Sequence, residues 1–440
     1  MGGNVKRLSS SQIIILGFAA AIIIGALLLM MPFSAREPVS FSDALFTATS
    51  AVCVTGLVVR DTATGWTAFG QGVILLLIQV GGMGVVTIAV ALAMVSGKKI
   101  SLKQRSTMQE AISAHKVGGI VHLTGFIIHV TAAFELAGAA LTAPVFCREF
   151  GFFRGLWYAL FHSVSAFCNA GFDLMGVKSP YSSLTFFADD PIINIVVMVL
   201  IVVGGIGFLT WDDVRTHKFH LHRYRMQSKV VIVTTALLIA LPAICFFFLE
   251  FDRLPLPERI LTSLFQAITP RTAGFNTADL TAMSDTGSAL MILLMLIGGS
   301  PGSTAVGMKT TTFALLLSTA ISVFRSQEHT HFFGRRIAHR TVRSAATILM
   351  MYLVLFLTGG LLICRVEGLP LMQCLFETAS AIGTVGLTMG ITPTLGQFSR
   401  AVLILLMFVG RVGGLTLIFS ALSGHRGNTA RLPEEKLTVG

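Results

Sequence analysis

The sequence has few charged residues, and this scarcity decides its broad class. Only 12% of the 440 residues are charged, whereas 54% are hydrophobic; a soluble domain has roughly a quarter of its residues charged. The mean hydropathy is +0.79. A soluble protein of this length would need far more polar surface, and several apolar runs reach the ~20 residues that span a bilayer as a helix. The sequence therefore predicts an all-α integral membrane protein.

Cysteine is also scarce, and its spacing argues against a metal centre or a redox pair. The six cysteines include no CxxC pair and have no histidine at metal-ligand spacing. Burial as small apolar side chains explains most of them. The chain also lacks the HExxH motif of zinc proteases. These absences predict that the protein is not an enzyme.

The net charge is +11, but its placement argues against nucleic acid as a partner. Three loops carry five Lys or Arg residues each, and Lys6 and Arg7 precede the first apolar run. The other loops together carry nine Lys or Arg residues against fourteen Asp or Glu residues. The basic loops are 97–117, 212–229 and 325–343; the others are 32–66, 144–190, 250–288 and 365–397. Such alternation follows the positive-inside rule, so we expect both termini and the basic loops to be cytoplasmic. Membrane lipids or a cytoplasmic partner could use this charge.

The apolar runs form four copies of one unit: a long helix, a short half-helix, a glycine-containing loop and another long helix. The expected spans are 13–31, 66–96, 118–143, 191–211, 229–249, 288–322, 343–364 and 397–423. The first run resembles a signal peptide but is too long and lacks a cleavage site, so we interpret it as an uncleaved span. We expect four tandem helix–pore-loop–helix repeats, with eight spanning helices and four re-entrant half-helices around a pseudo-four-fold central pore. The repeats should cover 1–117, 118–228, 229–342 and 343–440.

The half-helix of each repeat is too short to cross the membrane. Each of these segments opens with Leu-Phe and closes with glycine followed by Leu or Phe: LFTATSAVCVTGL (45–57), LFHSVSAFCNAGF (160–172), LFQAITPRTAGF (264–275) and LFETASAIGTVGL (375–387). From Phe to the closing Gly the gaps are 10, 10, 9 and 10 residues. A second glycine cluster follows in each descending helix: GGMG (81–84), GGIG (204–207), GGSPG (298–302) and GRVGG (410–414). Four such segments in parallel order indicate an internal repeat.

Re-entrant backbone at membrane depth must be buried in protein or bathed by water. Four loops that converge on one axis satisfy this requirement together. Their carbonyl groups can replace the water shell of a dehydrated cation. Glycine suits the tip of each loop because it adopts left-handed dihedral angles without strain. The negative C-terminal ends of the half-helices favour a cation nearby. This arrangement predicts a pore for a monovalent cation, in particular K⁺.

These features resemble the Ktr/Trk/HKT superfamily of potassium transporters. The resemblance covers nearly the whole chain and rests on the four repeats, on RTAGFNT (271–277) and on GGSPGSTAVGMKTTT (298–312). The absence of extra helices before the first repeat makes the chain more similar to the Ktr membrane subunits than to the longer Trk forms. The resemblance implies a homodimer in the bacterial plasma membrane and stimulation of uptake by Na⁺. It also implies a cytoplasmic ring of regulatory subunits, so that any nucleotide would bind to the partner.

The resemblance also assigns a selectivity filter, in which one glycine per repeat is the key residue. It carries over onto Gly56, Gly171, Gly274 and Gly386. The other filter carbonyls would come from Val54, Thr55, Asn169, Ala170, Thr272, Ala273, Thr384 and Val385. Plant relatives that prefer Na⁺ have serine in the first repeat, whereas all four positions are glycine in this chain. The resemblance therefore implies K⁺ as the transported ion.

The stretch 298–312 almost spells a nucleotide-binding loop. A P-loop reads GxxxxGK[ST], but Met308 separates Gly307 from Lys309, and no strand precedes the loop. We instead expect a helix that is broken over 298–309, because Pro and Gly free backbone groups that must line water or protein. A gate below the third filter loop is the hypothesis, and a static kink that only packs helices is the alternative. The gate residues would be Gly298, Gly299, Ser300, Pro301, Gly302, Ser303 and Thr304, with Arg411.

Arg411 interrupts the matching helix of the fourth repeat, where a charge is costly and indicates function. In the superfamily a cationic residue in this motif faces the pore, where it holds the gate loop or sets a barrier to cations. The alternative is an arginine that binds helix-end carbonyls for structure alone.

Four more polar residues lie in or near the apolar segments. Glu135 would pair with a buried His or Arg, or would be wetted near the outer interface. Arg271 would neutralise a carboxylate such as Asp173 or Glu377. His162 and Glu377 directly follow the Leu-Phe pairs. They would cap the starts of the half-helices; the alternative is that their imidazole and carboxylate tune the electric field on the outer side.

The function predicted from the sequence is K⁺ uptake down the electrochemical gradient, driven by ~2.3 kcal/mol per charge per 100 mV of membrane potential. The main alternative is the potassium-binding membrane subunit of an ATP-driven pump, which shares the four-repeat plan but tends to be longer. A secondary carrier for organic solutes would show two inverted halves instead of four parallel repeats.

Overall fold

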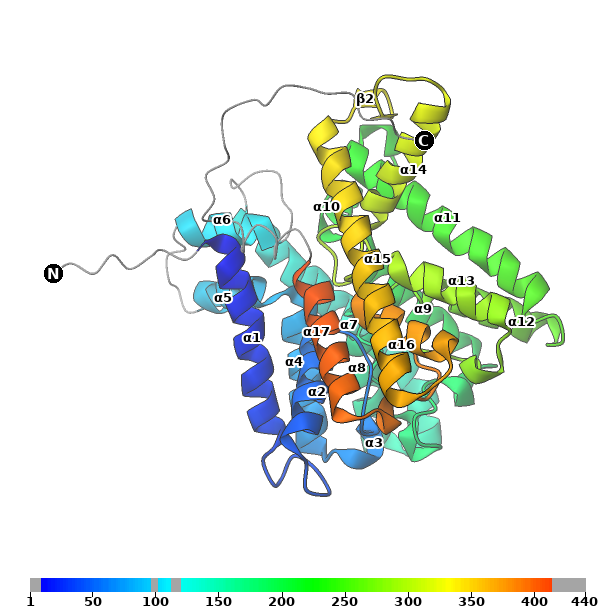
Figure 1. The fold of residues 1–440 in the computed structure, drawn as a ribbon. Helices are drawn as coiled ribbons and strands as arrows, with labels where there is room; N and C mark the ends of the chain where they lie inside the picture. Colours follow the sequence, from blue (N-terminus) through cyan, green and yellow to red (C-terminus); the bar gives the residue numbers. More distant parts are fainter. Residues whose placement is uncertain (1–8, 96–101, 112–119, 414–440) are drawn as a thin grey trace.

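The described part of the chain is mostly helical in the computed structural model, which describes residues 9–95, 102–111 and 120–413. The expected end of the last span at 423, most of the basic loop 97–117, and Lys6 and Arg7 lie outside the described residues. Long helices run roughly side by side, and shorter ones lie among them (Figure 1).

The first two repeats occupy the N-terminal half of the chain. The first repeat comprises α1 (Ser10–Leu29), α2 (Phe41–Cys53), α3 (Thr62–Gly65), α4 (Ala68–Met83), α5 (Val85–Val95) and α6 (Leu102–Ala111). The second comprises α7 (Ile120–Phe150), α8 (Phe152–Phe167), η1 (Met175–Val177), η2 (Thr185–Phe187), α9 (Pro191–Ile206) and α10 (Phe208–His217). The half-helices are α2 and α8.

The last two repeats follow the same order. The third comprises η3 (Leu221–Arg223), α11 (Met226–Leu249), α12 (Leu256–Ile268), η4 (Leu280–Ala282), α13 (Asp285–Leu296) and α14 (Thr310–Phe324). After the β1–β2 hairpin (His331–Phe332 and Arg335–Arg336), the fourth comprises α15 (His339–Glu367), α16 (Leu371–Gly383), η5 (Thr392–Thr394) and α17 (Gln397–Val412). The half-helices are α12 and α16.

The first helix of every repeat is a continuous apolar span: α1, α7, α11 and α15 are each long and apolar enough to cross a membrane. The second span is interrupted instead. The helices α4 and α5 meet at 97°, and α9 and α10 meet at 95°. The third repeat has the loop 297–309 between α13 and α14, and α17 is described to Val412. The expected spans 66–96 and 191–211 are therefore each made of two helices that meet at a sharp bend.

Glycine explains the two bends. Gly84 has φ 85° and Gly207 has φ 100°, which are backbone angles that end an α-helix and that only glycine adopts without strain. A Cβ added to Gly207 would lie 2.6 Å from the carbonyl oxygen of Pro301. The bend of the second repeat therefore leaves room for the loop 297–309 of the third.

Helix contacts close the four repeats into a ring. Within each repeat the half-helix packs on the long helix before it, as α2 on α1, α8 on α7, α12 on α11 and α16 on α15. Between repeats the descending helix packs on the next half-helix, as α4 on α8, α9 on α12, α13 on α16 and α17 on α2. The last contact joins the fourth repeat to the first, which confirms the pseudo-four-fold arrangement of re-entrant repeats.

Helix boundaries follow from local sequence. Ser9 forms a capping box with Gln12 at the start of α1. Thr67 caps α4, and Asp190 caps α9 before Pro191 at the first helical position.

The continuous spans place basic loops 212–229 and 325–343 on one side of the molecule, which we call the basic face; it is at the top of Figure 1.

Candidate functional site

Gly56, Gly171, Gly274 and Gly386 lie in a closed ring just beyond the C-terminal ends of the half-helices. A Cβ added to each would come within 3.0 Å of the carbonyl oxygen that precedes the glycine of the adjacent repeat, namely Ala170, Ala273, Val385 and Thr55 in turn. Real Cβ atoms do not approach an oxygen so closely, so each position needs glycine for space as well as for its dihedral angles. Four segments far apart in the sequence thus meet at one constriction.

The backbone has the same unusual course in all four segments. The glycines have φ of 96°, 67°, 80° and 95°. The residues two positions earlier, Val54, Asn169, Thr272 and Thr384, have φ of 59°, 58°, 67° and 49°, whereas the residue between has no positive φ. Left-handed angles in β-branched residues are genuine outliers, and such outliers gather at functional sites.

Hydrogen bonds fix this course. The amide of Thr55 donates to the Ser50 carbonyl (2.8 Å), and the amide of Gly56 donates to Ser50 Oγ (3.1 Å). The fourth repeat repeats both bonds, from Val385 to the Ser380 carbonyl (2.7 Å) and from Gly386 to Ser380 Oγ (2.9 Å). A serine six residues before the glycine therefore holds the loop tip in place.

The second and third repeats vary this scheme. Ala170 donates to the Ser165 carbonyl (2.8 Å), as in the first repeat, but Ser165 Oγ has no partner among the described residues. Ala273 donates to the Thr269 carbonyl (2.9 Å), four residues back instead of five. This shorter turn accounts for the Phe-to-Gly gap of 9 residues in the third repeat.

His162 and Glu377 lie in the middle of their half-helices, since α8 begins at Phe152 and α16 at Leu371. The expectation that they cap helix starts is therefore wrong. The Leu174 amide donates to His162 Nε2 (3.2 Å). The Glu377 carboxylate accepts from the hydroxyls of Thr388 and Thr392, the latter at 3.0 Å.

The position after Leu-Phe thus ties the loop beyond the glycine back to its own half-helix in two of the repeats. Its residue is Thr47, His162, Gln266 and Glu377 in the four repeats, and all four are buried. The aligned segments contain this signal, which the sequence interpretation missed.

A cavity of ≈ 100 Å³, which we call the mouth cavity, lies next to the glycine ring on the side away from the basic face. All four ring glycines line it, together with Asp61, Asp173, Tyr181 and other residues of the loops after the half-helices. The Met175 amide donates to Asp173 Oδ1 (2.8 Å). Burial raises the pKa of the Asp173 carboxyl to about 7, and the negative charge of Asp61 also acts to raise this pKa. The hydrogen bond from Met175 acts in the opposite direction and lowers it. Asp173 therefore adds negative charge to this mouth only above about pH 7.

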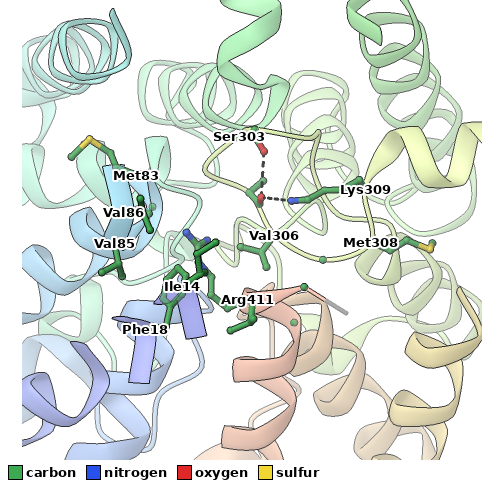
Figure 2. A pocket seen from close by; sticks show the side chains of 18 of the residues that line it. Ile14, Phe18, Met83, Val85, Val86, Ser303, Val306, Met308, Lys309 and Arg411 are labelled. Atoms are coloured by element: carbon green, nitrogen blue, oxygen red, sulfur yellow. Dashed lines mark hydrogen bonds between the residues drawn. The ribbon is translucent and has the colours of Figure 1, made fainter. Parts of the chain in front are cut away.

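A second cavity of ≈ 290 Å³, the loop cavity, lies towards the basic face. Its lining includes Gly302, Ser303 and Ala305–Lys309 of the loop 297–309, residues 82–86 and Arg411. Figure 2 shows Ser303 and Lys309 converging on the carbonyl of Ala305, at 3.2 and 2.9 Å. The cavity thus lies between repeats that are far apart in sequence.

The loop 297–309 is held by a network of bonds. Towards the second repeat, Ser300 donates to the Gly205 carbonyl (3.0 Å), and Phe208 donates to the Gly302 carbonyl (2.8 Å). Thr304 Oγ1 donates to the carbonyl of Phe167 at the end of α8 (2.9 Å). The loop therefore contacts the last residue of a half-helix, two residues before the strained Asn169.

Ser300 has a further local role. Gly298–Gly302 also spells GxSxG, a hydrolase nucleophile motif. Ser300 Oγ is fully buried and lies 3.1 Å from Thr310 Oγ1 instead of next to a histidine. The serine therefore ties the loop to the start of α14.

Arg411 links three repeats. Its guanidinium donates to the Thr304 carbonyl of the loop (3.3 Å) and to the Gly81 carbonyl at the end of α4. It also lies 5.2 Å from the ring centre of Phe18. The side chain both lines the loop cavity and binds helix-end carbonyls, so the geometry combines the two alternatives drawn from the sequence. Lys309 places a second cation in the same cavity.

The structure corrects two other expectations. Glu135 is buried and accepts from Gln79 Nε2 (3.2 Å), with Cys168 Sγ at 3.8 Å, so its partners are neither His nor Arg. Arg271 donates to Thr235 Oγ1 (3.2 Å) and forms no ion pair within the described part of the chain. It therefore does not neutralise Asp173 or Glu377.

Comparisons with known proteins agree with this architecture. A family profile described as "TrkH: Cation transport protein" matches residues 6–426. The Ktr system potassium uptake protein B of Bacillus subtilis is 38% identical, over 99% of this chain and 97% of its own length. The potassium/sodium uptake protein NtpJ of Enterococcus hirae is 39% identical, over 99% and 98%.

A solved structure shows the same fold. The crystal structure of the potassium transporter TrkH from Vibrio parahaemolyticus superposes with a TM-score of 0.75 at 20% sequence identity, and covers 95% of this chain and 85% of the other. The four repeats, the glycine ring and the full-length sequence match lead to one conclusion: the chain belongs to the TrkH family of cation transport proteins.

Proposed function

We propose that the protein mediates K⁺ uptake across the bacterial plasma membrane, through a filter formed by backbone carbonyl groups. The filter residues are Val54, Thr55, Gly56, Asn169, Ala170, Gly171, Thr272, Ala273, Gly274, Thr384, Val385 and Gly386. The observation that carries this proposal is the closed ring of four glycines, each so near the carbonyl before the next glycine that an added Cβ would clash with it. Carbonyl oxygens that replace a hydration shell are how protein filters select K⁺.

The names of the relatives support the choice of ion. The Ktr system protein B is described as a potassium uptake protein, and NtpJ as a potassium/sodium uptake protein. The glycine ring presents backbone groups to an ion, whereas the carboxylates of Asp61 and Asp173 line the adjacent mouth cavity. A weak negative field at the mouth would concentrate cations, whereas the ring would choose among them. These relatives give no support to the alternative of a pump subunit.

We further propose that the loop 297–309 is the gate. It lies between the half-helix ends and the loop cavity, and Gly298–Thr304 are held there by hydrogen bonds instead of by a continuous helix. Arg411 would act as the latch, because it joins the loop carbonyl of Thr304 to α4. Conduction would require the loop and the two cations beside it to move out of the path.

We further propose that the chain forms a homodimer to which a cytoplasmic ring of nucleotide-binding subunits attaches. The name Ktr system potassium uptake protein B, which refers to a system, supports the presence of a further subunit. Both termini and the basic face would then be cytoplasmic. We also propose that Na⁺ stimulates uptake by this chain; the name of NtpJ, a potassium/sodium uptake protein, supports a role for both ions.

The test is K⁺ or ⁸⁶Rb⁺ flux in liposomes that contain the purified protein. Gly171→Asp should abolish the flux, because its side chain would project into the ring. Gly390→Asp is the matched control: Gly390 has φ 85°, lines the same mouth cavity and has no atom within 4 Å of an added Cβ. Flux that survives Gly171→Asp in a folded protein, or flux of an organic solute without K⁺ flux, would overturn the proposal.

A further inference from the structure

A cavity of ≈ 360 Å³ on the basic face joins two segments that are a hundred residues apart. The turn before α11 and the β1–β2 hairpin form its lining, which consists of His222, Arg223, Tyr224, Arg225, Met226, Lys229, Phe333 and Arg335. None of these residues is acidic. We call this the basic cavity. Its charge suits an anion.

One of the four cations is already neutralised. The Arg225 guanidinium lies 2.8 Å from Asp212 and 3.4 Å from Asp213. Ser228 Oγ also donates to Asp213 (2.6 Å). These bonds hold the turn between α10 and α11, so the cavity is built before any ligand arrives.

Three cations remain for a ligand. Arg223 and Arg335 are exposed, and their side chains form no ion pair or hydrogen bond within the described residues. Lys229 Nζ donates to the His222 carbonyl (2.7 Å), which leaves two of its three donors. Arginine and lysine side chains that converge in this way recognise phosphate groups.

The position of these cations indicates a lipid and not a soluble anion. The helix α11 has 24 residues and is apolar enough to span a membrane, which gives a length of ~36 Å against a hydrocarbon core of ~30 Å. The first turn of α11, with Lys229 at its end, therefore lies at the level of the lipid headgroups.

An apolar stripe continues from Lys229 down the same helix. It consists of Val233, Leu237, Leu241, Ile244 and Phe248, which are 49–66% exposed. These positions lie within one face of the helix, at spacings of three and four residues. A stripe of exposed apolar side chains below a cluster of cations matches an acyl chain below a phosphate.

We propose that the basic cavity binds the headgroup of an anionic phospholipid of the inner leaflet, with an acyl chain along the stripe on α11. The phosphate would contact Arg223, Lys229 and Arg335, and Phe333 (56% exposed) would flank the glycerol region. This site goes beyond the proposed transport function, and lipid retention tests it without any flux measurement.

The experiment is native mass spectrometry of the purified chain with dioleoylphosphatidylglycerol, and with dioleoylphosphatidylcholine for comparison. The triple variant R223Q/K229Q/R335Q should retain phosphatidylglycerol less well, by about fivefold for each cation removed. The triple variant R325Q/R340Q/R343Q is the matched control, because it removes three exposed charges of the same face that do not line the cavity. It should retain the lipid like the unchanged protein.

Several results would overturn the proposal. Equal retention by both triple variants would show that only general surface charge matters. Equal retention of the two lipids would show that the headgroup charge is not read. Displacement of the lipid by millimolar inorganic phosphate would assign the cavity to a soluble anion instead. Loss of binding to an acidic regulatory protein with unchanged lipid retention would assign it to that protein. If the triple variant fails to fold, the single variant R335Q on the exposed hairpin replaces it, with an expected loss of retention of about fivefold.

Discussion

Val54, Thr272 and Thr384 show at the scale of single residues how far the filter segments depart from ordinary backbone. β-Branched residues avoid left-handed angles, and each such angle costs of order 1–3 kcal/mol. The chain nevertheless holds them at φ of 59°, 67° and 49°. Such strain persists only where the surroundings enforce it, and here the buried half-helix ends and the glycine ring do so.

Asp173 provides a pH-dependence prediction at the same scale. Burial raises the pKa of its carboxyl to about 7, so the group loses its negative charge as the pH on the mouth-cavity side falls through about 7. Cation flux should therefore decrease between about pH 8 and about pH 6. Asp173→Asn should have a low flux that is insensitive to this change, as measured by ⁸⁶Rb⁺ uptake into liposomes with the internal pH held constant. An unchanged pH profile in Asp173→Asn would assign the effect elsewhere.

Arg411 is the residue on which the latch hypothesis depends. Arg411→Ala removes the bonds to the Thr304 and Gly81 carbonyls and one cation from the loop cavity. We expect the K⁺ flux to rise about tenfold, equivalent to ~1.4 kcal/mol, and Arg411→Lys to lie between the two. Arg365→Ala, an exposed arginine on α15, serves as the control. Unchanged flux and affinity in Arg411→Ala would leave the arginine a purely structural role.

At the scale of elements, the second helix of each repeat is where the four copies diverge. The first two repeats bend at Gly84 and Gly207, whereas the third replaces the bend by the loop 297–309. The loop docks on the second repeat through backbone bonds to Gly205 and Phe208. Hydrogen bonds to other repeats, and not a continuous helix, hold the loop in place, so we expect its position to depend on these bonds.

Thr304→Val tests the hold on this loop with almost no change of shape. The substitution removes the bond from Thr304 Oγ1 to the Phe167 carbonyl, which is worth ~1 kcal/mol. If the bond keeps the gate closed, the flux should rise about fivefold. Thr358→Val removes a similar hydroxyl that bonds only within α15 and should leave the flux unchanged. A decrease in flux with Thr304→Val would show that the loop, in this position, supports the filter instead of blocking it.

At the scale of the whole molecule, two circular arrangements join the four repeats: one of packed helices and one of glycines. The descending helices pack on the next half-helices, and the ring glycines approach the neighbouring segments in the same order. Each repeat thus positions its neighbour, and no part of the glycine ring is independent of the others. A local change in any repeat should therefore propagate around the constriction.

Alanine at each ring glycine measures this coupling. Gly56→Ala, Gly171→Ala, Gly274→Ala and Gly386→Ala should each lower the flux by at least about tenfold, because each Cβ would meet a neighbouring carbonyl. A double variant should lose little more than a single one, since coupled sites are not additive. Gly390 also has a positive φ, but a Cβ added there meets no atom within 4 Å. Gly390→Ala therefore measures the effect of backbone strain without a steric clash. Additive losses would show four independent ligand groups and no ring.

The sequence by itself determined the membrane class, the four repeats and the four ring glycines, because composition, the Leu-Phe to Gly spacing and the need for glycine at positive φ are local properties. It also located the break at 298–309. Only the tertiary structure decided what the buried polar groups contact. Glu135 pairs with Gln79, Arg271 with Thr235, and His162 and Glu377 hold the loops beyond the ring. These partners come from other helices or from beyond a turn, and no local pattern encodes such distances. The sequence interpretation also did not include the bends at Gly84 and Gly207; the bend at Gly207 makes room for the loop 297–309 of another repeat.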